Sequence, residues 1–344
     1  MAALNTVGAA ISYDERIPAL RFAAVEIQKA AQAASPAKPV DFALAIDSAR
    51  LAPQGYRVER EVGGGIHVVG GDAAGAMYGG LDVAEAIRLG TLANLTSSEH
   101  KPYIERRGIK FNIPLDLRTP SYSDNGDSFQ ANIPEVWSPE FWHAFLDEMA
   151  RQRYNVLSLW NLHPFPSIVK VPEFPDIALQ DVWRTRAKLD DTFRLTGSDM
   201  VRPYMLEKPE VVKQMTIEQK VQFWRDVMQY AKDRGIDVYW FTWNIFVYGT
   251  GGKHGITVAQ DNPATIAYFR ASVRETVLTY PLLAGLGITA GEQMAGKECP
   301  ISKEQWLWQT YGEGVRDALK RQPGRQFRLI HRYHQTSQGE ILRT

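Results

Sequence analysis

Apolar positions in the first hundred residues alternate between helical and strand spacing. Residues 14–33 and 72–89 each place apolar side chains on one helical stripe, and Gly90 follows the second as a C-terminal cap. Three segments between them have the length and composition of short strands: 41–47, 56–61 and 66–70. Glycines at 63–65 predict a hairpin turn between the last two. The pattern predicts a small α/β domain over residues 1–104.

From residue 105 the pattern changes to strands alternating with helices, which favours parallel strands joined by crossover helices. Five strands are predicted: 107–115, 155–162, 237–245, 283–290 and 326–333. Helix-start signals lie between them: Ser138-Pro139-Glu140, the capping boxes Thr216/Gln219 and Ser302/Gln305, and Asn262-Pro263. Residues 164–215, rich in Pro, Asp and Arg, form a loop insertion in the second connection.

This alternation predicts that residues 105–344 form the N-terminal part of a (β/α)8 TIM barrel. A complete barrel takes about 250 residues for eight strands, and five strands would leave unpaired edges, so the sequence predicts a barrel truncated after about five strands. An open doubly wound sheet is the alternative. It does not explain why polar residues cluster at so many strand ends.

Composition and charge exclude several classes of partner. Thirty-nine basic residues balance thirty-nine acidic ones without a basic run, which argues against nucleic acid, and no stretch has the length of a membrane span. Cys299 is the only cysteine, which excludes an internal disulfide and a cysteine metal cage. The glycines at 63–65 and 70–71 lack the dinucleotide fingerprint, and no cofactor is predicted. Oligomeric state and export, which a removed signal peptide would leave unseen, stay open.

Barrel active sites lie at the C-terminal ends of the strands, and polar residues recur there. They are Asn112 and Asp116; Trp160, Asn161 and His163; Trp243 and Asn244; Glu292; and His331, Arg332 and His334. Glycoside cleavage needs an acid for the leaving oxygen, a second carboxylate, and polar or aromatic groups that hold the ring. Glu292 is the only glutamate at a predicted strand end, so it is the candidate catalytic acid. The alternative is an ion pair with Arg332 or Lys297 at the barrel rim.

The other strand-end residues are candidates for binding a sugar: Asp116, Trp160, Asn161, His163, Trp243, Asn244, His331 and Arg332. Two alternatives stay open, namely that His163 only orders the inserted loop and that Trp243 is barrel core. A zinc site formed by His331, His334 and Glu292 would require a bend, because residues three apart on a strand face opposite sides. No metal site is predicted.

The stretch from Gly55-Tyr56-Arg57-Val58 through Gly63-Gly64-Gly65 to Gly79 resembles the small domain that precedes the barrel in β-hexosaminidases and α-glucuronidases. Arg106-Arg107-Gly108-Ile109 is similar to the first barrel strand of those enzymes. Leu283 to Glu292 occupies the fourth-strand position at which they carry the general acid. The resemblance therefore implies a glycoside hydrolase that acts on an oligosaccharide or polysaccharide.

Within this resemblance the residue before the acid separates the two families. β-Hexosaminidases carry an aspartate there, which orients the acetamido group of the substrate, whereas this chain has Gly291. α-Glucuronidases carry a lone glutamate and place their base carboxylates on later strands. The resemblance thus favours an α-glucuronidase-like enzyme; a β-N-acetylhexosaminidase-like enzyme and a non-catalytic carbohydrate-binding barrel are the alternatives. A uronate would need a cation, and Arg332 and Arg118 are the candidates, unless both form rim salt bridges. Whether the mechanism is retaining or inverting stays open.

Overall fold

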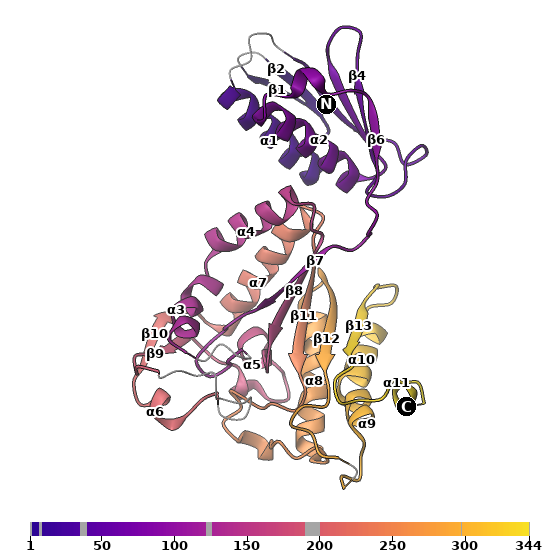
Figure 1. Cartoon of the computed structure of the whole chain (residues 1–344). Coiled ribbons are helices and arrows are strands. Elements are labelled where there is room, and N and C mark those ends of the chain that lie inside the picture. The colour runs from indigo at the N-terminus through magenta and orange to yellow at the C-terminus, as the bar shows by residue number, and fades with distance from the viewer. Residues whose placement is uncertain are drawn as a thin grey trace. The chain divides into compact units, whose positions relative to one another are not determined.

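A computed structural model gives the fold of the chain (Figure 1). The residues that it describes are 2–6, 9–34, 40–121, 126–189, 200–296 and 298–343. Contacts between Cα atoms divide the chain into two compact units. The first comprises Met1–Gly108, Phe145–Val156 and Tyr230–Ile236, and the second comprises Ile109–Ala144, Leu157–Gln229 and Asp237–Thr344.

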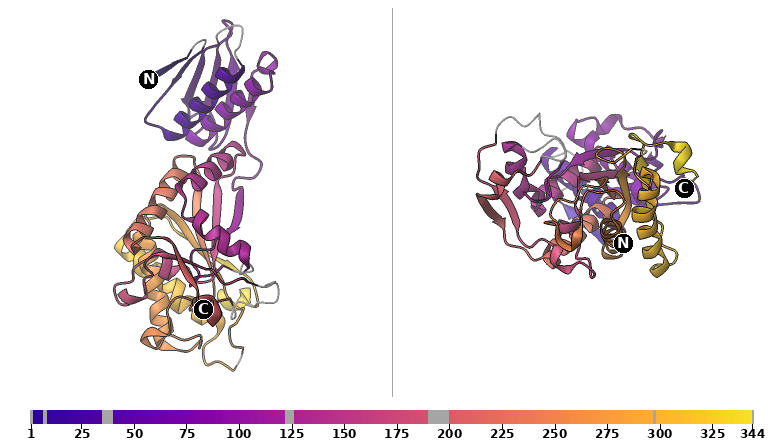
Figure 2. Two further views of the ribbon diagram at one scale, coloured as in Figure 1. Left: turned by 90° about the vertical axis from the view of Figure 1, so that its left-hand side faces the viewer. Right: turned by 90° about the horizontal axis from the view of Figure 1, so that it is seen from below.

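The first unit contains a six-stranded sheet in the order β1-β2-β3-β5-β4-β6, with two helices that pack against each other and against the sheet (Figures 1 and 2). Its strands are β1 (Ala2–Thr6), β2 (Ala9–Tyr13), β3 (Phe42–Ile46), β4 (Tyr56–Arg60), β5 (Ile66–Gly70) and β6 (Ser98–His100). Its helices are α1 (Pro18–Ala34), α2 (Ala73–Arg88) and the short 3-10 helix η1 (Leu92–Asn94). The sequence predicted α1, α2, β3, β4 and β5, but it did not predict β1, β2 or β6.

Two glycines of α2 allow this close packing. A Cβ atom at Gly79 would lie 2.7 Å from the ring of Tyr56 on β4, and one at Gly80 would lie 2.8 Å from the Cβ atom of Ala23 on α1. Real side chains do not approach so closely, so glycine lets α2 sit against the sheet on one side and α1 on the other.

The second unit is built on a five-stranded sheet in the order β13-β12-β11-β8-β7. Its strands are β7 (Gly108–Asn112), β8 (Val156–Asn161), β11 (Asp237–Trp243), β12 (Leu283–Thr289) and β13 (Arg328–Arg332). The pairs β11/β12 and β12/β13 are parallel. The order in space follows the order in the chain without a reversal, which is the arrangement of a barrel and not of a doubly wound sheet. The chain therefore has a small α/β domain followed by part of a barrel, as predicted.

The helices of this part are α3 (Asp127–Val136), α4 (Pro139–Arg151), α7 (Ile217–Lys232), α8 (Pro263–Thr279), α9 (Lys303–Leu307), the π-helical turn η4 (Trp308–Gly312), α10 (Glu313–Arg321) and α11 (Gln338–Ile341). Four of them, α4, α7, α8 and α9, begin at the predicted capping residues, and the sequence predicted no cap for the others. At the start of α7, Thr216 N donates to Gln219 Oε1 (2.8 Å) and Gln219 N donates to Thr216 Oγ1 (3.2 Å). Ser302 and Gln305 make the same reciprocal pair at α9.

Residues 190–199 of the predicted insertion lie outside the described residues, and its described parts form short elements of their own. These are α5 (Phe165–Ile168), η2 (Pro175–Ile177), β9 (Val182–Thr185), α6 (Pro203–Leu206) and β10 (Pro209–Lys213). Outside the insertion, the 3-10 helix η3 (Lys253–Gly255) follows β11. β9 and β10 form a two-stranded antiparallel sheet. Among the described residues, no helix combines the length and the apolar character needed to cross a bilayer.

The two faces of the five-stranded sheet are distinguished by what packs on them. Trp240 of β11 contacts Trp224 of α7 (ring centroids 4.9 Å apart), and Thr242 hydrogen-bonds to Tyr311 of η4. The even positions of β11 therefore face the helices. Its odd positions, including Phe241 and Trp243, face the opposite side, which we call the inner face because it is the interior side of a barrel.

Candidate active site

Glu292 lies on a sharply turned backbone segment directly after β12. Gly291 has φ +118° and Gln293 has φ +58°, so left-handed residues flank Glu292 on both sides. The left-handed region is unfavourable for glutamine, and such strain persists only where the surrounding structure enforces it. A strained turn at the C-terminal end of a barrel strand is a typical position for a catalytic side chain.

A second loop, the one that follows β13, holds this turn in place. A Cβ atom at Gly291 would lie 2.1 Å from the carbonyl oxygen of His334, so no side chain fits there. Lys303 Nζ donates to the carbonyl oxygens of Gly291 (3.2 Å) and Gln335 (3.4 Å) and so joins the two loops. The absence of the aspartate that precedes the acid in β-hexosaminidases thus has a steric reason, because the His334 carbonyl occupies its place.

The two oxygens of the Glu292 carboxyl group have different surroundings. Oε1 lies 3.0 Å from His334 Nε2, whereas Oε2 is buried and has no hydrogen-bond partner among the described residues. The side chain is 18% exposed. Asn244 donates its amide Nδ2 to the main-chain oxygen of Glu292. Glu292 is thus held by its backbone and by one carboxyl oxygen, while its other carboxyl oxygen is buried without a partner among the described residues.

Strand register places two further predicted residues on the inner face beside this turn. Thr289, the last residue of β12, pairs with Trp243 of β11 and with Arg332 of β13. Because registered residues of parallel strands share a face, Trp243, Thr289 and Arg332 form a row across the inner face. Thr289 in this row precedes Glu292 by three residues. Arg332 is exposed at the end of this row. The hydroxyl of Thr289 is buried without a partner among the described residues.

An aromatic cluster fills the inner face below this row. Trp160 stacks on Phe241 (ring centroids 4.4 Å apart, planes 9° apart) and meets Trp243 edge-on at 5.0 Å. The ammonium group of Lys110 on β7 lies 4.6 Å from the Trp160 ring centroid and 5.7 Å from that of Trp243. All three aromatic side chains are buried. Trp160 and Trp243 therefore pack as barrel core in this structure, which was the alternative interpretation for Trp243.

The sequence did not identify Lys110. The signal was available, because a lysine at an alternating position of the apolar strand Gly108–Asn112 must place its charge on one face of the sheet.

Asn161 and His163 order loops and do not line an open site. Asn161 is fully buried, and its Nδ2 donates to the carbonyl oxygens of Ile113 and Thr119 (3.0 Å each). His163 is also fully buried, with its Nδ1 2.5 Å from the carbonyl oxygen of Tyr248. Burial lowers the pKa of His163 to about 4, so the ring is neutral near pH 7. These contacts join the loops after β7, β8 and β11, in line with the loop-ordering alternative.

Asp116 and Arg118 bind each other. The guanidinium group donates to both carboxylate oxygens (2.7 and 2.9 Å), and its carbon lies 3.9 Å from the ring centroid of Trp183. Asp116 Oδ2 also accepts from Trp183 N (2.8 Å). Asp116 is fully buried, so this pair fixes the insertion to the end of β7 and leaves neither residue free for a sugar. The salt-bridge alternative for Arg118 is the one that the geometry supports.

His331 lies on the other side of the sheet from the candidate site. It pairs with Ile288 of β12, on the face that packs against the helices, and its Nε2 is 3.3 Å from Thr336 Oγ1. Burial lowers its pKa. His331 therefore does not join His334 at Glu292, and the described part of the chain holds no group of three or more His, Cys, Asp or Glu side chains placed to bind a metal ion. Lys297, the other proposed ion-pair partner of Glu292, lies outside the described residues.

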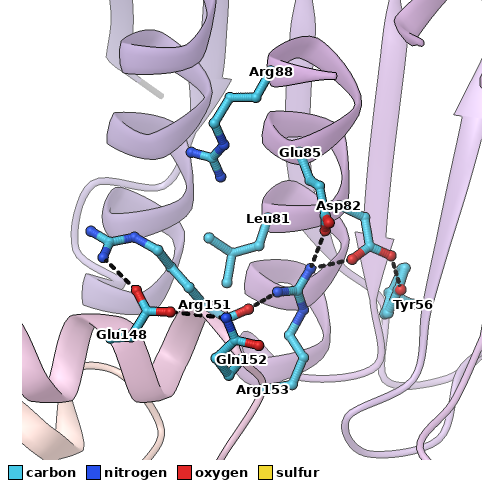
Figure 3. A pocket seen from close by; sticks show the side chains of 9 residues that line it. All are labelled: Tyr56, Leu81, Asp82, Glu85, Arg88, Glu148, Arg151, Gln152 and Arg153. Atoms are coloured by element: carbon cyan, nitrogen blue, oxygen red, sulfur yellow. Dashed lines mark hydrogen bonds and ion pairs between the residues drawn. The ribbon is translucent and has the colours of Figure 1, made fainter. Parts of the chain in front are cut away.

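Two cavities have the size of a possible substrate site. One, of about 370 Å³, adjoins the turn and is lined by Ile245, Phe246, Val247, Tyr248, Val258 and Gln293. The other, of about 510 Å³, lies in the first unit (Figure 3). There Arg153 pairs with Asp82, which also accepts from the hydroxyl of Tyr56, and Arg151 pairs with Glu148 (3.2 Å). Because these charges neutralise one another, we interpret the second cavity as an ion-pair network, and only the first adjoins the candidate acid.

Comparisons with known proteins agree with the fold. No protein-family model matches the chain, and no curated protein matches it. Among solved structures, the chain is similar to a GH138 enzyme targeting pectin rhamnogalacturonan II, with a TM-score of 0.72 and 21% identity over 98% of this chain and 36% of that one.

It is also similar to the GH20 exo-β-N-acetylglucosaminidase from Vibrio harveyi (TM-score 0.53, 13% identity, 96% of this chain and 53% of that one). The β-N-acetylhexosaminidase from Bacteroides fragilis gives a TM-score of 0.54 and 15% identity over 96% of this chain and 63% of that one. The chain thus spans 36% of the GH138 enzyme and less than two thirds of the other two enzymes. It shares the fold of their α/β domain and of part of a barrel.

Proposed function

We propose that this chain belongs to a glycoside hydrolase in which residues 1–104 form the small α/β domain, residues 105–344 contribute to the catalytic barrel, and Glu292 is the general acid. The observation that carries the proposal is the strained turn after the fourth strand, where the partly exposed Glu292 side chain pairs with His334 through Oε1 and has a buried Oε2 without a partner among the described residues. All the solved structures named above are of glycoside hydrolases. Strain of this kind clusters at active sites and at ligand clamps.

In the proposed reaction, the protonated Glu292 gives its proton to the glycosidic oxygen as the bond to the anomeric carbon breaks. A second carboxylate must act as nucleophile or as base for water, about 5 Å away for retention and further away for inversion. Asp116 is a poor candidate because it is buried and bound in two places to Arg118. The stereochemical outcome therefore depends on a carboxylate other than Asp116.

For the substrate we propose an acidic polysaccharide, cleaved in an α-glucuronidase-like manner at a uronate. Two observations support this choice. The similar GH138 enzyme targets rhamnogalacturonan II, whose name denotes galacturonate units. Arg332 ends the row on the inner face and is exposed, and a guanidinium group binds a carboxylate through two parallel hydrogen bonds. A hexosaminidase activity is disfavoured because the His334 carbonyl fills the place of the aspartate that such enzymes carry.

The test is hydrolysis of a panel of glycosides by the full-length gene product. The panel contains pectic oligosaccharides, aryl glucuronides and galacturonides, the corresponding neutral hexosides, and N-acetylglucosaminides. We expect cleavage of a uronide and a fall in kcat/KM of at least about 100-fold in Glu292→Gln. Arg332→Gln should lower kcat/KM about 10- to 100-fold on the uronide and leave the neutral hexoside nearly unchanged, because only the uronide loses a charged contact.

Arg316→Gln is a matched control, since Arg316 lies on α10 and pairs there with Glu313 (2.5 Å). Cleavage of N-acetylglucosaminides alone would contradict the substrate proposal. Binding of glycans without cleavage of any glycoside would favour a carbohydrate-binding barrel instead.

A further inference from the structure

We infer that His334 is a positioning residue for Glu292: it fixes Oε1 and with it the orientation of the whole carboxyl group. The inference rests on the proposed function of Glu292 as general acid. It starts from the 3.0 Å distance between His334 Nε2 and Glu292 Oε1 and from the unpartnered state of Oε2 among the described residues.

The contact is built by two loops that fit each other closely. Gly291, directly before the acid, approaches the backbone of His334 more closely than any side chain allows, and its Cβ position would also lie 2.9 Å from the Cβ atom of Gln335. Gln335 itself has φ +55°, so the loop that carries His334 is strained next to the contact, as is the loop that carries Glu292. Two strained loops that meet at one carboxyl group indicate that the geometry of this group is what the strain maintains.

The charged neighbours of this pair come from two elements. Lys303 on α9 is bonded to the carbonyl oxygens of both loops, and Glu304 beside it accepts from Ser337 N (2.9 Å). On β13, Arg332 points to the inner face, whereas His331 points to the helices. None of these takes the place of His334 on Glu292 Oε1.

The chemical consequence follows from the order of events. When the Glu292 carboxyl group gives its proton to the glycosidic oxygen, it becomes a carboxylate, and its negative charge is shared between Oε1 and Oε2. A hydrogen bond donated by His334 Nε2–H to Oε1 becomes charge-assisted at that moment and stabilises the product side of the proton transfer. The same bond restricts rotation of the carboxyl group and so keeps it in one orientation toward the leaving group. No proton leaves His334 in this step.

The experiment compares His334→Ala and His334→Gln in the full-length protein on two substrates with the same sugar. One has a leaving group that requires protonation, such as a sugar or an alcohol, and the other has an activated dinitrophenolate. We expect His334→Ala to lower kcat about 10- to 100-fold on the first substrate and less than about 3-fold on the second. Glutamine can place an N–H near the position of Nε2, so His334→Gln should recover most of the loss.

His254→Gln is the matched control. His254 also pairs with a carboxylate, at 2.7 Å from Asp176, but it is exposed in the loop after β11. This variant should behave as the parent on both substrates. An equal loss on both substrates in His334→Ala, without recovery in His334→Gln, would mean that the histidine has only a structural role and would overturn the inference.

A measurement without turnover separates this inference from the proposed function. In proton NMR spectra of the protein at low temperature, the ring N–H of His334 should give a downfield resonance that disappears in Glu292→Ala and persists in Asp176→Ala. If it is absent from the parent, the contact and the inference both fail, whatever the activity. If it is present but no glycoside is cleaved by the parent, the general-acid proposal fails while the contact stands.

Discussion

The buried histidine His163 makes stability depend on pH in a predictable direction. Its ring is fully buried among aromatic side chains, with Phe165 and Phe269 at 5.5 and 5.4 Å between centroids, and its Nε2 has no partner among the described residues. Protonation would therefore bury a charge with one unsatisfied N–H group. This desolvation lowers the pKa to about 4, against 6.5 for an ordinary imidazole, although the bond to the Tyr248 carbonyl acts in the opposite direction.

The sign and size of the effect follow from proton linkage. Between pH 6.5 and pH 4 the unfolded chain binds a proton at His163 and the folded chain does not, so acidification favours unfolding. Each unit of pKa corresponds to about 1.36 kcal/mol, and the free energy of unfolding should therefore fall by about 3 kcal/mol as the pH falls from about 6.5 to about 4. Above pH 6.5 this group contributes no pH dependence.

The assay is reversible urea unfolding of the protein and of His163→Phe at several pH values between about 4 and about 7.5, followed by tryptophan fluorescence. The variant loses the bond to Tyr248 and should be less stable at pH 7, but this offset does not depend on pH. The difference between the two proteins should therefore shrink by about 3 kcal/mol on acidification. A difference that stays constant from pH 7 to pH 4 would refute the account of His163 as a buried neutral ring.

Two further predictions concern glycines on β12 and after it. Gly287→Ala should lower the free energy of unfolding by about 1 to 3 kcal/mol, because its Cβ atom would lie 2.1 Å from the ring of Phe241. Urea unfolding measures this loss. The control is Gly63→Ala, which has open space around its Cβ atom and no left-handed φ and should change the free energy of unfolding by less than about 0.5 kcal/mol. Gly291→Ala should lower kcat/KM by at least about 10-fold, because the methyl group would push the His334 carbonyl away; unchanged kcat/KM would show that the two loops need not be in contact during turnover.

Local signals explain why much of the fold could be predicted from the sequence. The capping boxes at Thr216 and Ser302 are formed by residues three apart and act within one helical turn, and all five barrel strands were located to within about two residues at most ends. β6 was missed because Ser98–His100 is a three-residue edge strand without an apolar pattern. Its pairing with β4 is a tertiary contact that no local pattern encodes.

The candidate site was predicted less completely, for a physical reason. β11 is apolar on both faces, as parallel barrel strands usually are, so its sequence does not show that Trp243 faces inward with Trp160 while Trp240 faces the helices. Only the contacts of Trp240 with Trp224 and of Trp243 with Trp160 show which face each side chain occupies. The sequence alone indicated that His331 and His334 point to opposite sides of the sheet, because residues three apart on a strand do so. The contact of His334 with Glu292 depends on loop geometry, which the sequence signals only through Gly291.

The most direct test of the account is the leaving-group dependence of Glu292→Gln in the full-length protein. If Glu292 is the general acid, the variant should lose about 100-fold or more in kcat/KM on glycosides whose leaving group must be protonated. It should retain most of the activity of the parent on dinitrophenyl glycosides of the same sugar, which need no proton. An equal and large loss on both kinds of substrate would contradict the assignment and would indicate that Glu292 acts as a nucleophile or only supports the fold.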